Sequence, residues 1–176
     1  MRKITNEELN RLTPDEFAAA EKLPVEIVLD NIRSLNNVGS FFRTADAFAC
    51  ARVHLCGITA TPPNREIHKT ALGAELTVDW RYFEHTLDAV KALQADGYIV
   101  YAIEQAHGST MLSNLQLPQN QKTAIIMGHE VFGVQQEVVD AANGCIEIPQ
   151  YGTKHSLNVS VTAGIVMYQL SNMLRY

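Results

Sequence analysis

Short apolar segments alternate with longer amphipathic segments along most of the chain, and this alternation limits the possible folds more than any other feature. The apolar segments are rich in β-branched residues, as strands are, and the segments between them have helical spacing. Strands are predicted at residues 25–29, 52–56, 77–82, 98–103, 123–127 and 145–148. Helices are predicted at residues 38–49, 64–72, 86–95 and 135–142, and a last helix begins near Ser156. This order predicts an α/β fold with a mainly parallel sheet and helices on both faces.

The chain is long enough for one domain with a substantial core, and no linker, repeat or low-complexity segment divides its 176 residues. Two patterns typical of helix N-termini, Thr5 to Glu8 and Thr13 to Glu16, precede Pro24. We therefore expect a short helical N-terminal extension, residues 1–23, followed by the main domain, residues 24–176.

Membrane and metal sites are not expected. No apolar segment has the length that a bilayer requires, and the N-terminus is polar, so we expect a cytoplasmic protein. The cysteines, Cys50, Cys56 and Cys145, lie in apolar surroundings without a Cys-x-x-Cys spacing. This context favours reduced thiols over disulfides or a zinc site.

The C-terminal part of the chain is predicted to form a strand, a polar loop at residues 150–155 and a long apolar helix. Such a unit brings loop amides and a helix N-terminus together, where they can hold a polar ligand. Ser156 and Asn158 fall in the expected first turn, and either is explained as a helix N-cap or as part of a ligand site. No Gly-x-Gly-x-x-Gly follows the first strand, which argues against a dinucleotide site.

Three motifs occur in the order found in a known family. They are NIRSLNNVGSFFRTAD from Asn31 to Asp46, IMGHEVFG from Ile126 to Gly133, and Ile148, Pro149 and Gly152 with SLNVSV from Ser156 to Val161. Together they resemble the signatures of the SpoU/TrmH family, the knotted (SPOUT-class) RNA ribose methyltransferases. The resemblance runs from about Val25 to the C-terminus and implies a C-terminal trefoil knot. Periodicity does not predict a knot, and general topology rules disfavour one.

The resemblance implies that S-adenosylmethionine donates a methyl group to a ribose 2′-hydroxyl of tRNA or rRNA, with S-adenosylhomocysteine as the product. Such a displacement needs alignment of the reactants and removal of the hydroxyl proton, but no metal. The family's cofactor contacts map to Gly128, Ile148 and Leu157, with their neighbours Met127, Gly133, Pro149 and Gly152. Its catalytic or active-site positions map to Arg43, Asn37, Glu130, Ser156 and Asn158.

Each of these residues also has a purely structural interpretation. Ile148 and Leu157 can be core residues, Asn37 an N-cap, Glu130 a solvated carboxylate and Arg43 a surface arginine. A guanidinium stays protonated, so we expect Arg43 to hold an RNA phosphate and stabilise the developing alkoxide, while the phosphate or water takes the proton. His129 matches no obligatory position and is assigned no role.

The partners expected from the resemblance are a tRNA or rRNA substrate and a second copy of the chain. The last helix is apolar on more than one face, which fits a homodimer but also burial within one subunit. The net charge of −5 is unusual for an RNA-binding protein, so we expect a local basic cluster. Its candidates are Arg33, Arg43, Arg65, His68, Lys69, Lys154 and His155.

Two details of this interpretation concern the ends of the chain. The acidic N-terminal extension is expected to pack against the main domain or a partner subunit rather than against RNA. Gly152 is expected to adopt a positive φ that directs loop amides toward the cofactor.

Two other functions compete with ribose methylation. A protein of the same fold can bind RNA or an adenosyl ligand without transferring a methyl group, and the complete set of active-site residues argues against this. An RNA base methyltransferase would require a general base directed at a ring nitrogen, whereas these motifs resemble the ribose-modifying branch. The target nucleotide does not follow from the sequence.

Overall fold

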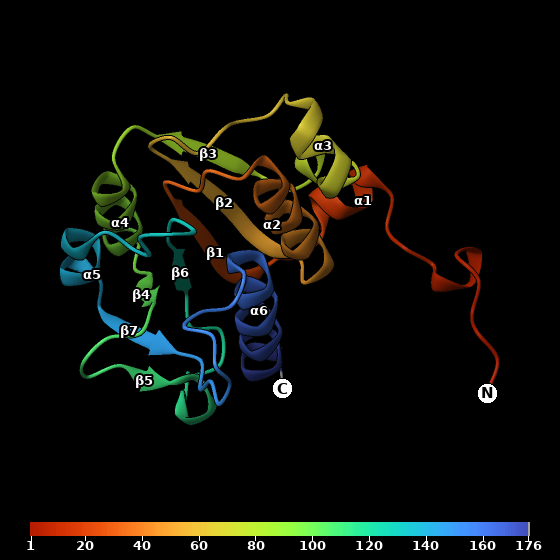
Figure 1. The fold of residues 1–176 in the computed structure, drawn as a ribbon. Coiled ribbons are helices and arrows are strands. Elements are labelled where there is room, and N and C mark those ends of the chain that lie inside the picture. Colours follow the sequence, from red (N-terminus) through yellow and green to blue (C-terminus); the bar gives the residue numbers. More distant parts are fainter. Residues whose placement is uncertain (176) are drawn as a thin grey trace.

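Every strand of the sheet runs parallel to its neighbours, as the alternation of strands and helices predicts. The computed structural model describes residues 1–175 and contains a seven-stranded sheet of order β3-β2-β1-β6-β4-β7-β5 (Figure 1). The strands are β1 (Leu23–Asp30), β2 (Cys50–Cys56), β3 (Trp80–Phe83), β4 (Ile99–Ile103), β5 (Thr110–Met111), β6 (Thr123–Met127) and β7 (Gly144–Glu147).

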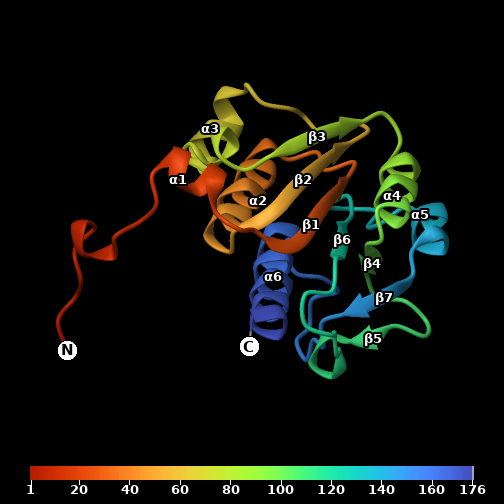
Figure 2. The same ribbon diagram turned by 180° about the vertical axis from the view of Figure 1, so that it is seen from behind.

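Helices cover both faces of this sheet, as Figures 1 and 2 show from opposite sides. The α-helices are α1 (Pro14–Ala19), α2 (Leu35–Ala47), α3 (Arg65–Ala71), α4 (Thr86–Ala95), α5 (Gln136–Ala141) and α6 (Val159–Arg175). Three short 3-10 helices are η1 (Glu7–Leu9), η2 (Ala74–Leu76) and η3 (Leu112–Asn114). The larger core cluster contains side chains of α2, α3 and α6, and the smaller one contains side chains of α4 and α5.

Strand β1 shows why the apolar segments are nearly continuous in sequence. Its side chains Val25, Ile27 and Leu29 enter the larger cluster, while Val28 enters the smaller cluster on the opposite face. All four are fully buried. A parallel strand covered on both faces needs apolar residues at successive positions rather than at alternate ones.

The N-terminal extension begins with an exposed segment and ends against the core. Thr13 and Glu16 form the predicted capping box, and Pro14 occupies the first turn of α1. Phe17 of α1 is buried in the larger cluster, whereas residues 1–16 are all exposed. Both views show the first residues leading away from the sheet. The division into an extension and a main domain stays a prediction.

Several predicted elements differ from the structure. The helix predicted at residues 38–49 is α2, which begins at Leu35, because Ser34 supplies its cap. The last helix begins at Val159 and not near Ser156, because Asn158 supplies the cap. The segment between β4 and β6, for which the sequence predicts no element, contains β5 and η3, which are too short to give a periodic pattern. β3 begins only at Trp80, because the preceding residues form η2 and a turn. The trefoil knot stays a prediction, since strand order alone does not establish how the chain is threaded.

The remaining global features concern the cysteines and the membrane. Cys50 and Cys56 are buried free thiols, and burial raises the pKa of each to about 12. Cys145 is also free and is half-buried. Within residues 1–175, no helix combines the length and the apolar character needed to cross a membrane.

Candidate active site

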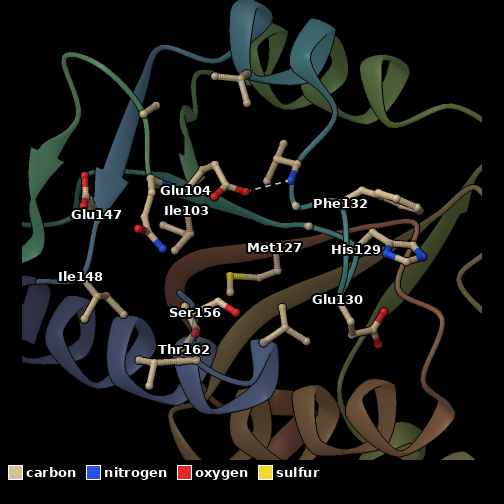
Figure 3. A pocket seen from close by; sticks show the side chains of 18 of the residues that line it. Ile103, Glu104, Met127, His129, Glu130, Phe132, Glu147, Ile148, Ser156 and Thr162 are labelled. Carbon is tan, nitrogen blue, oxygen red and sulfur yellow. Dashed lines mark hydrogen bonds between the residues drawn. The ribbon is translucent and has the colours of Figure 1, made fainter. Parts of the chain in front are cut away.

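A cavity of about 1270 Å³ lies at the carboxyl ends of β4, β6 and β7 (Figure 3). Its walls are the segments that follow these strands and the first turn of α6. Strands β6 and β4 are neighbours in the middle of the sheet. The direction in which strands are added reverses there, because β1, β2 and β3 extend the sheet on one side and β7 and β5 extend it on the other. Ligands of open α/β sheets bind at such positions. The strand, loop and helix unit that was expected to hold a polar ligand forms the β7 side of this cavity.

Most of the residues selected by the resemblance line this cavity. They are Met127, Gly128, Glu130, Gly133, Ile148, Ser156, Leu157 and Asn158. Asn37, Arg43, Pro149 and Gly152 are not part of the wall. The second and third motifs therefore form the cavity directly, and the first motif reaches it through another residue.

That residue is Glu130, whose carboxylate anchors the beginning of α2. Its Oε1 accepts hydrogen bonds from the Ser34 amide at 2.9 Å and from Asn37 Nδ2 at 2.9 Å, and its Oε2 accepts from the Arg33 amide at 3.1 Å. Asn37 Oδ1 in turn accepts from Asn158 Nδ2 at 3.3 Å. One continuous hydrogen-bond chain, Glu130–Asn37–Asn158, thus joins the three motifs.

The environment of Glu130 keeps it ionised. Partial burial raises the pKa of its carboxyl group, but the hydrogen bonds from Asn37, Ser34 and Arg33 outweigh burial and leave the pKa lowered. The interpretation of Glu130 as a solvated carboxylate is therefore wrong. A carboxylate with a lowered pKa and three donors is a poor proton acceptor, so its geometry suits positioning rather than base catalysis.

Asn158, and not Ser156, caps the last helix. Its Oδ1 accepts from the Ser160 amide at 2.9 Å and the Val161 amide at 3.3 Å, which satisfies two free amides of the first turn. The same side chain donates to Asn37, so capping and site roles coexist. Ser156 is exposed on the cavity wall before the helix begins.

Two glycines shape the loop that follows β6. A Cβ on Gly128 would lie 2.1 Å from the Val134 amide nitrogen, and a Cβ on Gly133 would lie 2.1 Å from Glu104 Oε2. Gly133 also has a φ of +69°, which side chains disfavour. The loop is closed by paired backbone hydrogen bonds of 3.0 and 2.8 Å between His129 and Gly133. Gly128 is therefore required by close backbone packing, and Gly133 by its positive φ.

Glu104 is a cavity residue that the sequence analysis missed. It follows β4, and its Oε2 accepts from the Val134 amide at 3.1 Å, as Figure 3 shows. The next residue, Gln105, donates from Nε2 to the His155 carbonyl at 2.6 Å and so ties the loop before α6 to the end of β4. A polar pair at a strand end was the available signal, but it lies in a segment for which the sequence predicts no element.

The other selected residues lie away from the cavity wall. Arg43 is exposed on α2, and within residues 1–175 no hydrogen bond or ion pair holds its side chain. Gly152 is exposed, and the predicted positive φ is wrong, because the described residues with positive φ do not include it. A Cβ on Gly152 would meet no atom within 4 Å, so the loop does not require glycine there for packing.

The charge of the cavity wall is negative. Among its described residues, four are carboxylates and none is lysine or arginine. The carboxylates are Glu104, Glu130, Asp140 and Glu147. Of the expected basic cluster, Lys69 contacts Glu66 at 2.7 Å and His68 contacts Glu75 at 2.5 Å, so both already have a carboxylate partner.

The parallel sheet and the cavity at its strand ends are similar to those of a solved RNA methyltransferase. The solved structure of an rRNA methyltransferase from Sinorhizobium meliloti with bound AdoMet matches 92% of this chain and 61% of its own, with a TM-score of 0.80 and 26% sequence identity.

A family model described as the SpoU rRNA Methylase family matches residues 24–168, and the chain belongs to this family. This result confirms the resemblance seen in the three motifs.

Two curated relatives have related names. A tRNA (guanosine(18)-2'-O)-methyltransferase of Borreliella burgdorferi is 32% identical over 148 residues, which are 84% of this chain and 66% of that protein. A protein of the same name from Thermus thermophilus is 27% identical over 168 residues, which are 96% of this chain and 80% of that protein. The chain thus spans about two thirds to four fifths of the length of these relatives.

Proposed function

We propose that this protein is an S-adenosylmethionine-dependent enzyme that methylates a ribose 2′-hydroxyl in tRNA or rRNA. Family membership and the names of its relatives support the reaction class. The single observation that carries the proposal is the Glu130–Asn37–Asn158 chain, which joins all three motifs beside the cavity.

The cavity suits S-adenosylmethionine better than a nucleoside phosphate. Ile148 and Leu157 offer apolar surface to an adenosyl group, and Glu104 offers a carboxylate to polar groups of the ligand. When bound, the cofactor supplies a methyl group on a positively charged sulfonium. A cavity wall that carries carboxylates but no lysine or arginine favours binding of such a cation, whereas it would repel a phosphate.

The protein's own residues would align the nucleophile. Glu130 holds Asn37 and the first turn of α2, and Asn37 holds Asn158 at the cavity wall. Arg43 on α2 would bind an RNA phosphate and stabilise the developing alkoxide. The 2′-oxygen forms a bond to the methyl carbon as the sulfur–methyl bond breaks, and the hydroxyl proton goes to the phosphate or to water.

Methyl transfer from labelled S-adenosylmethionine to bulk tRNA and rRNA tests this function. We expect label in RNA and, after nuclease digestion, in 2′-O-methylated nucleosides. Label in methylated bases would support the base-methyltransferase alternative instead. Cofactor binding by calorimetry without any transfer would support a non-catalytic binding protein.

We also propose a homodimer formed through one face of α6. The exposed apolar side chains Val161, Ile165 and Tyr168 recur at intervals of four and three residues, so they lie along one stripe of α6. Their exposed fractions are 53, 40 and 57%, which is unusual for a row of large apolar side chains on one helix. Light scattering should give twice the chain mass, and Val161→Glu should give monomers. A monomeric mass for the parent protein would reject the dimer.

The remaining proposals concern the extension and the cellular location. Residues 1–23 would be an appendage to a main domain of residues 24–176, with Phe17 as the point of attachment. Removal of residues 1–12 should then leave the unfolding temperature within a few degrees of the parent value. We place the reaction in the cytoplasm, where its proposed RNA substrates occur.

A further inference from the structure

The loop between His129 and Gly133 displays apolar side chains that contribute nothing to the core. Val131 is 66% exposed and Phe132 is 83% exposed at its tip. Single exposed apolar side chains are common, but Val131 and Phe132 are adjacent and both line the cavity, and such an apolar patch favours a binding surface. The position lies inside the second motif, but the resemblance assigns it no role.

This tip is held rigidly. The paired backbone bonds between His129 and Gly133 close the loop, and the Val131 amide donates to His129 Nδ1 at 3.0 Å. The rings of His129 and Phe132 have centroids 4.9 Å apart with an interplanar angle of 35°. His129 therefore supports the Phe132 ring from one side and leaves the rest of the ring open to a ligand.

The tip also lies at the proposed reaction site. Phe132 is part of the cavity wall and is two residues from Glu130, which anchors the hydrogen-bond chain to Asn37 and Asn158. Figure 3 shows His129 and Phe132 side by side at the edge of the cavity where Glu130 lies. A group bound on the ring is thus next to the residues that would align the 2′-hydroxyl.

We propose that Phe132, supported by His129, is a stacking platform for a nucleobase of the RNA substrate at or next to the methylated nucleotide. This inference rests on the proposed function and adds how the RNA is held. Proteins that bind unpaired RNA stack its bases on aromatic side chains. A net charge of −5 weakens non-specific attraction to phosphates, so contacts to bases should contribute a larger share of the affinity.

The proposal has a consequence for the choice of substrate. A base can stack on Phe132 only if it has left its own helical stack, because bases inside a duplex are already covered on both faces. The methylated nucleotide should therefore lie in a loop, a bulge or another unpaired segment. Stacking also tolerates all four bases, so Phe132 should contribute affinity rather than sequence preference.

The test compares RNA binding by the parent protein and Phe132→Ala in the presence of S-adenosylhomocysteine, with bulk tRNA and an unmodified rRNA transcript as probes. We expect the affinity of Phe132→Ala to fall on the order of tenfold, which is typical for loss of one stacked base. The slope of affinity against salt should stay unchanged, because stacking releases no counterions. The control is Leu76→Ala, since Leu76 is 80% exposed on η2 outside the site and its loss should not affect binding.

A second variant, Phe132→Trp, makes stacking directly visible. This variant should bind RNA with an affinity within a fewfold of the parent value. RNA should quench its tryptophan fluorescence more than it quenches the fluorescence of the parent, whose one tryptophan is Trp80. Quenching by S-adenosylhomocysteine alone would assign the ring to the cofactor and reject the proposal. A change of mass in Phe132→Ala by light scattering would assign it to a subunit contact and also reject the proposal.

The remaining outcomes separate this inference from the proposed function. If the parent methylates RNA but Phe132→Ala binds RNA with parental affinity, the platform is rejected and the enzymatic function stands. If the parent neither binds nor methylates either RNA, the proposed function is rejected and the platform fails with it.

Discussion

Two carboxylates, one in strand β1 and one just after the neighbouring strand β6, both have a lowered pKa but differ in their surroundings. Glu130 follows β6 and borders the cavity, whereas Glu26 is buried within β1. Tyr98 donates to Glu26 at 2.8 Å, and His54 and Arg52 also contact its carboxylate. For Glu26, burial raises the pKa, but the hydrogen bonds from His54 and Tyr98 and the nearby positive charges leave it lowered.

The difference between them shows that a shifted pKa does not by itself identify a functional site. The partners of Glu26 are the buried His54 and the half-buried Arg52 and Tyr98, and Glu26 does not line the active-site cavity. The partners of Glu130 are two loop amides and Asn37, and they connect three motifs beside a cavity. We infer that Glu26 contributes to stability and that Glu130 contributes to alignment of the site.

The largest expected effect belongs to Arg43, the free cation on the helix that Glu130 anchors. Arg43→Ala should lower the single-turnover methylation rate about a hundredfold or more, because one preorganised charge-stabilising group is lost. Cofactor affinity should hardly change. Arg43→Lys should rescue poorly, since a point charge does not reproduce the planar fork on a phosphate. With correction for the folded fraction by circular dichroism, a rate within a fewfold of the parent would reject the catalytic assignment.

Glu130→Ala is the next test, and it addresses the alignment role directly. Loss of the carboxylate frees Asn37 and the first turn of α2, and a misplacement of about 1 Å in a site can lower the rate about a hundredfold. We expect that rate loss with cofactor affinity close to the parent value by calorimetry. If the rate falls only in proportion to the folded protein, Glu130 is a structural residue like Glu26 and the comparison fails.

Glu26→Gln should show the opposite pattern. It removes the charged acceptor of Tyr98 and His54, and we expect the free energy of unfolding to fall by about 1–3 kcal/mol. The methylation rate per folded molecule should equal that of the parent. Urea unfolding gives the first quantity and single-turnover kinetics the second. Tyr98→Phe, which removes one of the same hydrogen bonds, should have a smaller effect in the same direction.

Acidification should expose the contribution of Glu26 to stability. Because its pKa is lower in the folded protein, its ionised form stabilises the fold. This contribution is complete above the unfolded-state pKa of about 4.3 and is lost as the pH falls through the lower folded-state value. The difference in unfolding free energy between the parent and Glu26→Gln should therefore shrink below about pH 4. A constant difference in urea titrations across this range would contradict the assignment.

The smallest effects concern the N-cap of α6, for which the sequence offers two candidates, Ser156 and Asn158. Asn158→Ala should lower the free energy of unfolding by about 1 kcal/mol, the usual cost of losing an N-cap. Ser156→Ala should change it by less than about 0.5 kcal/mol, since an exposed residue outside the helix is removed. Equal losses in thermal unfolding would mean that Ser156 shares the cap.

Local sequence was sufficient for the elements and for the motif positions. The helix Thr86–Ala95 and the strand Thr123–Met127 have their predicted bounds, and the capping box of Thr13 and Glu16 forms as expected. These features depend on neighbours a few residues apart, whose preferences are visible in the chain itself. The parallel class of the sheet also follows, because alternation of strands and helices leaves few other arrangements.

Only the tertiary structure decided how the motifs act together. Glu130 and Asn37 are 93 residues apart and Asn37 and Asn158 are 121 apart, yet hydrogen bonds connect them. Glu104 likewise lies in the cavity wall through the tertiary structure, because β4, which it follows, lies between β6 and β7. Periodicity records which face of an element is buried, but not which strand ends will meet. The order of strands in the sheet makes that choice, and with it the partners of each polar side chain.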